Sequence, residues 1–272
     1  MGYTLHKPTQ SSSGDPNSRS AAVRPQADSQ ADRFAAYLHN QEELKRLKKE
    51  DKWLTALYTA AGSAITASIL IPEPLSRMGS LLVGTVGGKA VLQRIEKVNS
   101  IYRTGDALNE TFKERGLQIS VDLPVPDHGR LDLLLKFPLP PKKAMFAVAL
   151  RSQGKAKVFY NEAKGALYVR RGEAGLKRWN PDHIERLGMQ GFWLRQNRQE
   201  ELFGTSRNDR NRPIVKLLVL TGQTTLGKHS DALYTQVGDQ RVLLLRKQSS
   251  VYVMEENQLL PFLQAWLAPS EQ

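Results

Sequence analysis

Two charged residues interrupt two neighbouring apolar segments of this chain. Asp132 lies within residues 129–135, and Arg151 ends the apolar part of residues 145–154. The apolar content of both segments predicts strands, and the proline- and lysine-rich residues 136–143 between them predict a turn. A carboxylate can contribute to a metal site, and a guanidinium can contact a phosphate through its planar fork. The alternative is that Asp132 ends a strand and Arg151 faces solvent.

The surroundings of this pair indicate a weak metal site. Residues two apart on a strand share a face, so Ala147, Ala149 and Arg151 are predicted to lie on one side of the second strand. Mg²⁺ and Mn²⁺ need one or two carboxylates together with waters and phosphate oxygens. Asp132 alone therefore provides too few ligands for a good metal site. Arg151 cannot be deprotonated and does not substitute for a lysine.

This pair of strands resembles the core hairpin of the PD-(D/E)xK nuclease superfamily. There the first strand carries an Asp and the second carries Glu/Asp-x-Lys, where this chain has Ala149-Leu150-Arg151. A helix predicted at residues 100–115 and a strand predicted at residues 117–123 precede the hairpin, in the order typical of the superfamily. The nuclease-related domain (NERD) family is the most similar, because Arg151, Gly154, the hairpin of residues 157–171 and Trp179 fit its outline.

The resemblance, which covers residues 100–222, implies a fold and a set of roles. The fold is an α/β restriction-endonuclease-like mixed sheet flanked by helices. If the chain hydrolyses phosphodiesters, Asp132 holds Mg²⁺ or Mn²⁺, Glu110 is an accessory carboxylate, Arg151 stabilises the phosphate and Gln153 orients water. The altered Glu-x-Lys element predicts hydrolysis that is weak or absent.

A literal Glu-x-Lys does occur, at Glu162-Ala163-Lys164. Asn161 and Gly165 flank it between two short apolar segments, which predicts the turn of a hairpin. We interpret it as a solvated turn, because a turn tip cannot face Asp132 across paired strands.

Composition favours a polyanionic partner. The chain has a formal net charge of +12 and no cysteine, which excludes disulfides and cysteine-based metal or redox chemistry. Residues 141–212 carry 16 basic and 7 acidic side chains. Such a balance is typical of nucleic-acid binding, with DNA favoured over RNA; a solvated basic face or an anionic membrane surface are the alternatives. The candidate nucleic-acid contacts are Lys155, Lys157, Arg195, Arg198, Arg207 and Arg210.

The N-terminal part of the chain has a different character. Residues 1–30 are polar and predicted to be disordered, and residues 31–98 form a helical region. Within it, residues 53–71 and 78–92 are apolar enough to predict a membrane hairpin, and its basic flanks would place both ends in the cytoplasm. A hairpin packed on the domain, or an oligomerisation element, is the alternative.

These patterns lead to two hypotheses. The first is a nucleic-acid-binding protein whose α/β domain, residues 99–272, is a degenerate PD-(D/E)xK nuclease. The second is a non-enzymatic, membrane-anchored scaffold or assembly protein that reuses the fold. The predicted location is the cytoplasmic face of a membrane, or the cytoplasm if the hairpin of residues 53–92 is soluble.

Overall fold

The computed structural model describes residues 26–69, 74–139, 143–203, 210–246 and 249–268. Over these ranges the chain is an α/β protein in which a mixed sheet is flanked by helices and preceded by a long helical hairpin. The fold class predicted from the sequence is confirmed at that level. Residues 1–25, most of the segment predicted to be disordered, lie outside the described residues, and the first helix begins at Gln26.

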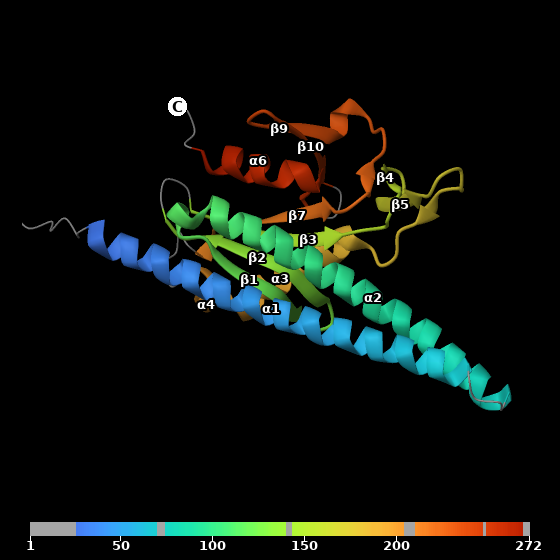
Figure 1. The fold of residues 1–272 in the computed structure, drawn as a ribbon. Coiled ribbons are helices and arrows are strands. Elements are labelled where there is room, and N and C mark those ends of the chain that lie inside the picture. Colours follow the sequence, from blue (N-terminus) through green and yellow to red (C-terminus); the bar gives the residue numbers. More distant parts are fainter. Residues whose placement is uncertain (1–25, 70–73, 140–142, 204–209, 247–248, 269–272) are drawn as a thin grey trace, which may run out of the picture.

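Helices α1 (Gln26–Ile69) and α2 (Pro74–Thr111) form the hairpin, whose far end projects well beyond the sheet (Figure 1). The helix predicted at residues 100–115 is the last part of α2 and not a separate element. The boundary predicted after residue 98 therefore falls inside one continuous helix. A short 3-10 helix, η1 (Lys113–Arg115), follows, and Gly116 ends it with φ 61°, a conformation that favours glycine.

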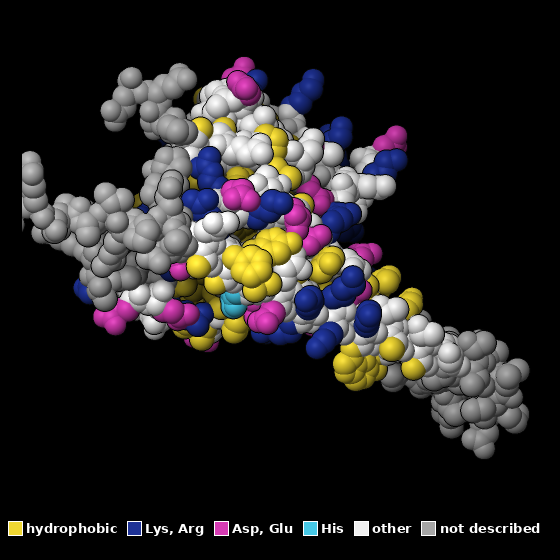
Figure 2. Space-filling view, turned by 60° about the vertical axis from the view of Figure 1, so that its left-hand side comes forward, with side chains coloured by type: hydrophobic (Ala, Val, Ile, Leu, Met, Phe, Trp, Pro, Cys, Tyr) yellow, Lys and Arg dark blue, Asp and Glu magenta, His cyan; other side chains and the backbone are white. Residues whose placement is uncertain are grey.

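The projecting part of the hairpin shows basic and hydrophobic side chains next to each other (Figure 2). Among the side chains that the structure describes there, the exposed large hydrophobic ones are Trp53, Leu57, Tyr58 and Leu92. No helical segment among the described residues combines the length and the apolar character needed to cross a membrane.

The main sheet has seven strands in the order β1-β2-β3-β7-β11-β10-β9. The strands are β1 (Gln118–Val125), β2 (Gly129–Phe137), β3 (Ala144–Arg151), β7 (Ile214–Leu220), β9 (Tyr234–Val237), β10 (Gln240–Leu245) and β11 (Val251–Glu255). The central strands β3, β7 and β11 are parallel, and the outer pairs are antiparallel. Helices cover both faces of the centre, which explains the near-continuous apolar sequences of β3 and β7.

Two layers cover the sheet. One face packs against the base of the hairpin and against α6 (Glu256–Leu267), in a core that includes Phe137, Phe146 and Phe262. The other packs against α3 (His183–Asn197) and the short α4 (Gln199–Phe203), in a core that includes Leu134, Leu187 and Leu218.

A second sheet of four short strands lies beyond the end of β3 (Figure 1). Its order is β6 (Lys177–Arg178), β5 (Ala166–Arg170), β4 (Lys157–Asn161) and β8 (Thr225–Leu226). Strands β4 and β5 form the hairpin that the sequence predicts, and the η2 turn (Asp231–Leu233) leads from β8 toward β9.

An ion-pair network fixes the hairpin to the edge of the sheet. Asp122 of β1 is buried and adopts φ 48°, which Asp tolerates better than most residues. It accepts hydrogen bonds from Arg94 of α2 at 2.6 Å and from Arg130 of β2 at 2.8 Å, and Arg94 also binds Glu50 of α1 at 2.7 Å. Burial raises the pKa of Asp122, but the two arginines reverse the shift, so the pKa is below its ordinary value.

Candidate functional site

Asp132 lies where two strands separate. Strands β2 and β3 pair from Phe137–Ala144 to Leu133–Val148, and no pairing is formed further along. The carboxylate of Asp132 accepts a hydrogen bond from the Leu150 N–H at 2.8 Å. This side chain therefore satisfies a buried main-chain donor of β3 that has lost its ladder partner.

Two cations bind the same carboxylate. Lys97 of α2 places its Nζ 2.7 Å from Asp132 Oδ1, and Arg151 pairs with Oδ2 through Nη1. The Asp132 side chain is 0% exposed, and those of Arg151 and Lys97 are 13% and 30% exposed. Asp132 and Arg151, the two charged residues singled out in the sequence, thus contact each other in the structure. Lys97 is a third member that we did not identify from the sequence.

This arrangement does not fit a divalent metal ion. Both carboxylate oxygens of Asp132 already bind cations, which occupy the positions that Mg²⁺ or Mn²⁺ would need. Ala149, on the face where a second carboxylate would stand, is buried against the α3 side of the sheet. Among the described residues no group of three Asp, Glu or His side chains could hold a metal.

His183, the first residue of α3, completes the cluster. The helix begins there because the Asp182 side chain accepts hydrogen bonds from the main-chain N–H groups of Ile184 and Glu185. Arg151 Nε donates to His183 Nδ1 at 3.2 Å, so the neutral ring carries its proton on Nε2. Burial first, and then nearby positive charge, lower the pKa of His183 from 6.5 to about 3.

The shift of His183 predicts a pH dependence of stability. Its folded-state pKa is depressed, so the stabilisation is complete above pH 6.5 and is lost as the pH falls from 6.5 toward 3. We expect the free energy of unfolding to fall by about 2 kcal/mol between pH 7 and pH 5 from this group. Urea unfolding at both pH values checks this.

The matched variant is His183→Gln, whose amide oxygen can accept from Arg151 without titrating in this range. Its free energy of unfolding should change less between pH 7 and pH 5 than that of the wild type, by about the same 2 kcal/mol. Equal pH dependence in the two proteins would show that His183 is not held neutral by the cluster.

A cleft of about 1380 Å³ opens above the cluster. It lies between α2, the end of β3 with the following loop, Arg171 after β5, the start of α3 and residues 221–223 after β7, so five separate segments contribute to it. Its basic side chains are Lys97, Arg103, Arg151, Arg171 and Arg186, and Glu96 is the only lining carboxylate among the described residues. Burial and the charge of Arg151 lower the pKa of Arg186, while its Nε donates to the His128 carbonyl at 2.8 Å.

The remaining predicted catalytic residues have different positions. Gln153 lines the cleft, where its side-chain oxygen accepts from Arg171 at 2.6 Å. Glu110 is on α2, as expected, but accepts from Tyr37 at 2.7 Å. It lies thirteen residues beyond Lys97 on α2, which is roughly 20 Å along a helix axis. The structure therefore does not bring Glu110 to Asp132.

The predicted nucleic-acid contacts fall into two groups. Lys155 and Lys157 are exposed and lie next to the cleft. Arg195 instead donates to the carbonyls of Arg210 and Arg212 at 3.0 and 2.6 Å, and Arg198 pairs with Glu201 at 2.9 Å. These residues are at the far end of α3 from His183. Arg207 lies outside the described residues.

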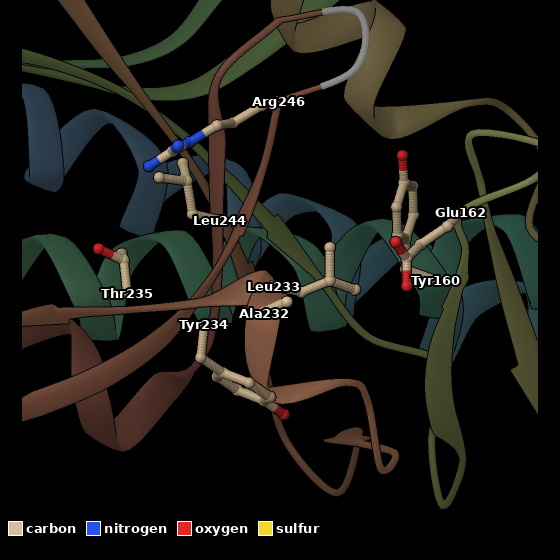
Figure 3. A pocket seen from close by; sticks show the side chains of 8 residues that line it. All are labelled: Tyr160, Glu162, Ala232, Leu233, Tyr234, Thr235, Leu244 and Arg246. Atoms are coloured by element: carbon tan, nitrogen blue, oxygen red, sulfur yellow. The ribbon is translucent and has the colours of Figure 1, made fainter.

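The literal Glu-x-Lys is in a turn, as predicted. The Lys164 N–H donates to the Asn161 side chain at 3.0 Å, and Gly165 has φ 61°. Glu162 lines a separate cavity of about 250 Å³ with Tyr160, Tyr234 and Arg246, in which no residue of the Asp132 cluster takes part (Figure 3).

The sequence does contain a signal for the helix that supplies Lys97. Polar residues recur along α2 at helical spacing on the cleft side, and Val98 and Ile101 on the other side are buried. The polar stripe consists of Gln93, Glu96, Lys97, Ser100 and Arg103. The sequence around Arg171 and Arg186 shows no comparable polar stripe, because Arg171 lies in a loop and Arg186 lies in the first turn of α3.

No protein-family model matches this chain, and searches among curated proteins and solved structures find no similar protein. The resemblance to the nuclease-related domain therefore stays a prediction from the residues of the β2–β3 hairpin.

Proposed function

We propose that this chain binds the phosphate backbone of nucleic acid in the cleft above Asp132, through a degenerate restriction-endonuclease-like domain with little or no hydrolytic activity. The observation that supports this proposal most strongly is the excess of positive charge in the cleft. Five cationic side chains line it, against Glu96 on its wall, Asp132 beneath it and Glu256, which pairs with Arg103 at 2.8 Å.

The charge balance favours an anionic ligand. Lys97 and Arg151 share one carboxylate, so the buried group retains a net positive charge. Arg186 adds another partly buried cation, and His183 contributes no charge because it is neutral. A phosphate supplies the missing negative charge and accepts the planar guanidinium fork of arginine.

The size of the cleft favours a polymer over a small anion. Small-molecule pockets measure roughly 300–1,000 Å³ and are mostly apolar. This cleft, at about 1380 Å³, is larger and is lined by many polar side chains. DNA is the expected ligand, and RNA of the same sequence is the alternative to test.

The occupied carboxylate supports binding without hydrolysis. In the resemblance to PD-(D/E)xK nucleases, Asp132 is the metal ligand, but here Lys97 and Arg151 hold both of its oxygens. Cations fixed in this way stabilise a bound phosphate, yet neither one generates a metal-activated water.

The double variant Arg103→Ala/Arg171→Ala tests the proposal. Each lost phosphate contact lowers the slope of log K against log salt by about 0.7 for single strands, so we expect a reduction of about 1.4. The same slope implies affinity for a 20-nucleotide DNA roughly twentyfold lower at 0.1 M salt. Fluorescence anisotropy over a salt series measures both quantities.

The control is Lys45→Ala/Lys49→Ala, which removes the same charge from exposed positions on α1. It should retain the wild-type affinity and slope. Equal losses in both variants would mean that only net charge matters and that the cleft is not the site. Mg²⁺- or Mn²⁺-dependent cleavage by the wild type would contradict the absence of hydrolysis.

A second candidate is the non-enzymatic scaffold, membrane-anchored or self-assembling. The exposed Trp53, Leu57, Tyr58 and Leu92 on the projecting hairpin favour it, because isolated domains seldom expose such a group without a partner. A chain that binds no oligonucleotide and is recovered as an assembly or with membranes would support this candidate.

A further inference from the structure

The outer face of the second sheet carries aromatic and basic side chains. Strands β4 and β5 alternate, so Val158, Leu167 and Val169 pack into the core while their neighbours face outward. On the outer side Phe159 stands opposite Tyr168, and Lys157 opposite Arg170. Both rings are only half-buried.

Cations lie over these rings. The Arg170 guanidinium is 4.8 Å from the centre of the Phe159 ring, and Lys164 is 5.8 Å from that of Tyr168. Arg241 lies over Tyr234 of β9 in the same way, at 4.4 Å. Phe159, Tyr234 and their arginines line one cavity of about 700 Å³ together with Lys157 and Lys228, with Asp231 as the only carboxylate among its described lining residues.

This aromatic cavity continues into the cleft above Asp132. A third cavity, of about 550 Å³, lies between them. It shares Gln223 with the cleft and shares Lys157 and Arg170 with the aromatic cavity. Lys155 lines it as well. The three cavities therefore adjoin one another through shared lining residues, and we call them together the basic track.

We propose that this track binds single-stranded nucleic acid, with bases stacking at Phe159–Arg170 and Tyr234–Arg241 and phosphates contacting Lys155 and Lys157. The inference rests on the proposed function, which it extends to a ligand class. Aromatic rings and guanidinium planes take up unstacked bases, whereas duplex bases are already stacked on one another.

The experiment compares oligonucleotides of different length and strandedness by anisotropy with the full chain. A 6-nucleotide DNA, a 20-nucleotide DNA, an RNA of the same sequence and the 20-base-pair duplex are the probes. We expect the 20-nucleotide strand to bind more tightly than either the 6-nucleotide strand or the duplex. The comparison of the DNA strand with the RNA strand of the same sequence shows whether the track prefers deoxyribose or ribose.

Two variants locate the track. Lys157→Ala/Arg170→Ala, both exposed, should lower affinity for the 20-nucleotide strand roughly twentyfold and leave the 6-nucleotide strand within about twofold. Phe159→Leu keeps apolar volume and removes the ring, so about tenfold weaker binding of the long strand is expected. Thermal unfolding of each variant confirms that the fold is retained, and Tyr234→Leu repeats the stacking test at the other ring.

The outcomes separate the two proposals. If long strands bind and depend on Arg103 and Arg171 but not on Lys157, Arg170 or the two rings, the track is wrong and the cleft stands. Duplex binding equal to single-strand binding also overturns the track. If no oligonucleotide binds, both proposals fail.

Discussion

Replacing Asp132 by Ala is expected to lower the free energy of unfolding by about 3–5 kcal/mol. The substitution removes a carboxylate that is 0% exposed and leaves Lys97 and Arg151 without their shared counter-charge. It also leaves the buried Leu150 N–H without its acceptor. Urea unfolding at pH 7 measures the loss.

The control is Asp231→Ala, which removes an ion-paired aspartate whose side chain is 92% exposed. Exposed pairs contribute little, so its midpoint should stay near that of the wild type. A second comparison, Lys97→Met/Asp132→Leu/Arg151→Met, removes all three charges together. It should be more stable than Asp132→Ala, because no buried charge is left unpaired. Wild-type stability in Asp132→Ala would contradict the structural role.

The direction of this effect distinguishes a binding cluster from a metal site. Carboxylates that are gathered for a metal repel one another, so their removal is often neutral or stabilising. Asp132 has the opposite surroundings, because its neighbours are cations. A large loss of stability would therefore support the interpretation that the carboxylate organises the cleft and does not hold a metal.

The sequence predicted the local half of the site. Asp132 and Arg151 are on adjacent strands joined by a short connection, and such pairs follow from the two-residue period of strands. Lys97, Arg171 and Arg186 come from other elements, and their meeting depends on how α2, the second sheet and α3 dock. A pattern within one segment carries no information about that docking.

Arg195 and Arg198 show why counting charges can assign nucleic-acid contacts to the wrong residues. Arg195 and Arg198 were predicted to bind phosphate, but main-chain carbonyls and Glu201 occupy their donors. Composition records each positive charge and does not record the partners that fold beside it. Lys155 and Lys157 are exposed because Lys155 lies in the loop before β4 and Lys157 lies on the outward face of that strand.

The helical hairpin shows a similar limit. The spacing of Ile101, Leu108 and Phe112 predicted a helix where α2 packs on the sheet, and the preceding residues 78–92 were predicted as a separate apolar helical segment. The same helix extends much further toward the N-terminus, where no sheet lies beneath it (Figure 1). Hydrophobic periodicity reports burial, so it shows the docked part of a helix and not its full length.

Replacing Asn40 by Ala is the second change with a large expected effect, a loss of about 3–5 kcal/mol. Asn40 of α1 is 0% exposed and joins three elements. Its Nδ2 donates to Asn109 of α2 at 2.7 Å and to the Leu117 carbonyl at 2.6 Å, and its Oδ1 accepts from the Ile119 N–H of β1 at 2.8 Å. Truncation leaves these buried groups without partners. Chemical unfolding followed by circular dichroism measures the loss.

Gln41→Ala is the matched control. Gln41 is the half-buried neighbour of Asn40 on α1, and it makes one long hydrogen bond, to Tyr37 at 3.4 Å. It should change stability little.

Two probes then show whether the hairpin and the sheet unfold together in Asn40→Ala. Helical circular dichroism is weighted toward α1 and α2, and the fluorescence of the buried Trp179, measured in a background where Trp53, Trp193 and Trp266 are replaced by Phe, reports the α3 side of the sheet. Coincident transitions in Asn40→Ala would show that the hairpin and the sheet remain coupled without Asn40. A helical transition that precedes the fluorescence change would show that the hairpin detaches first, and Asn40 would then hold α2 in place without stabilising the sheet itself.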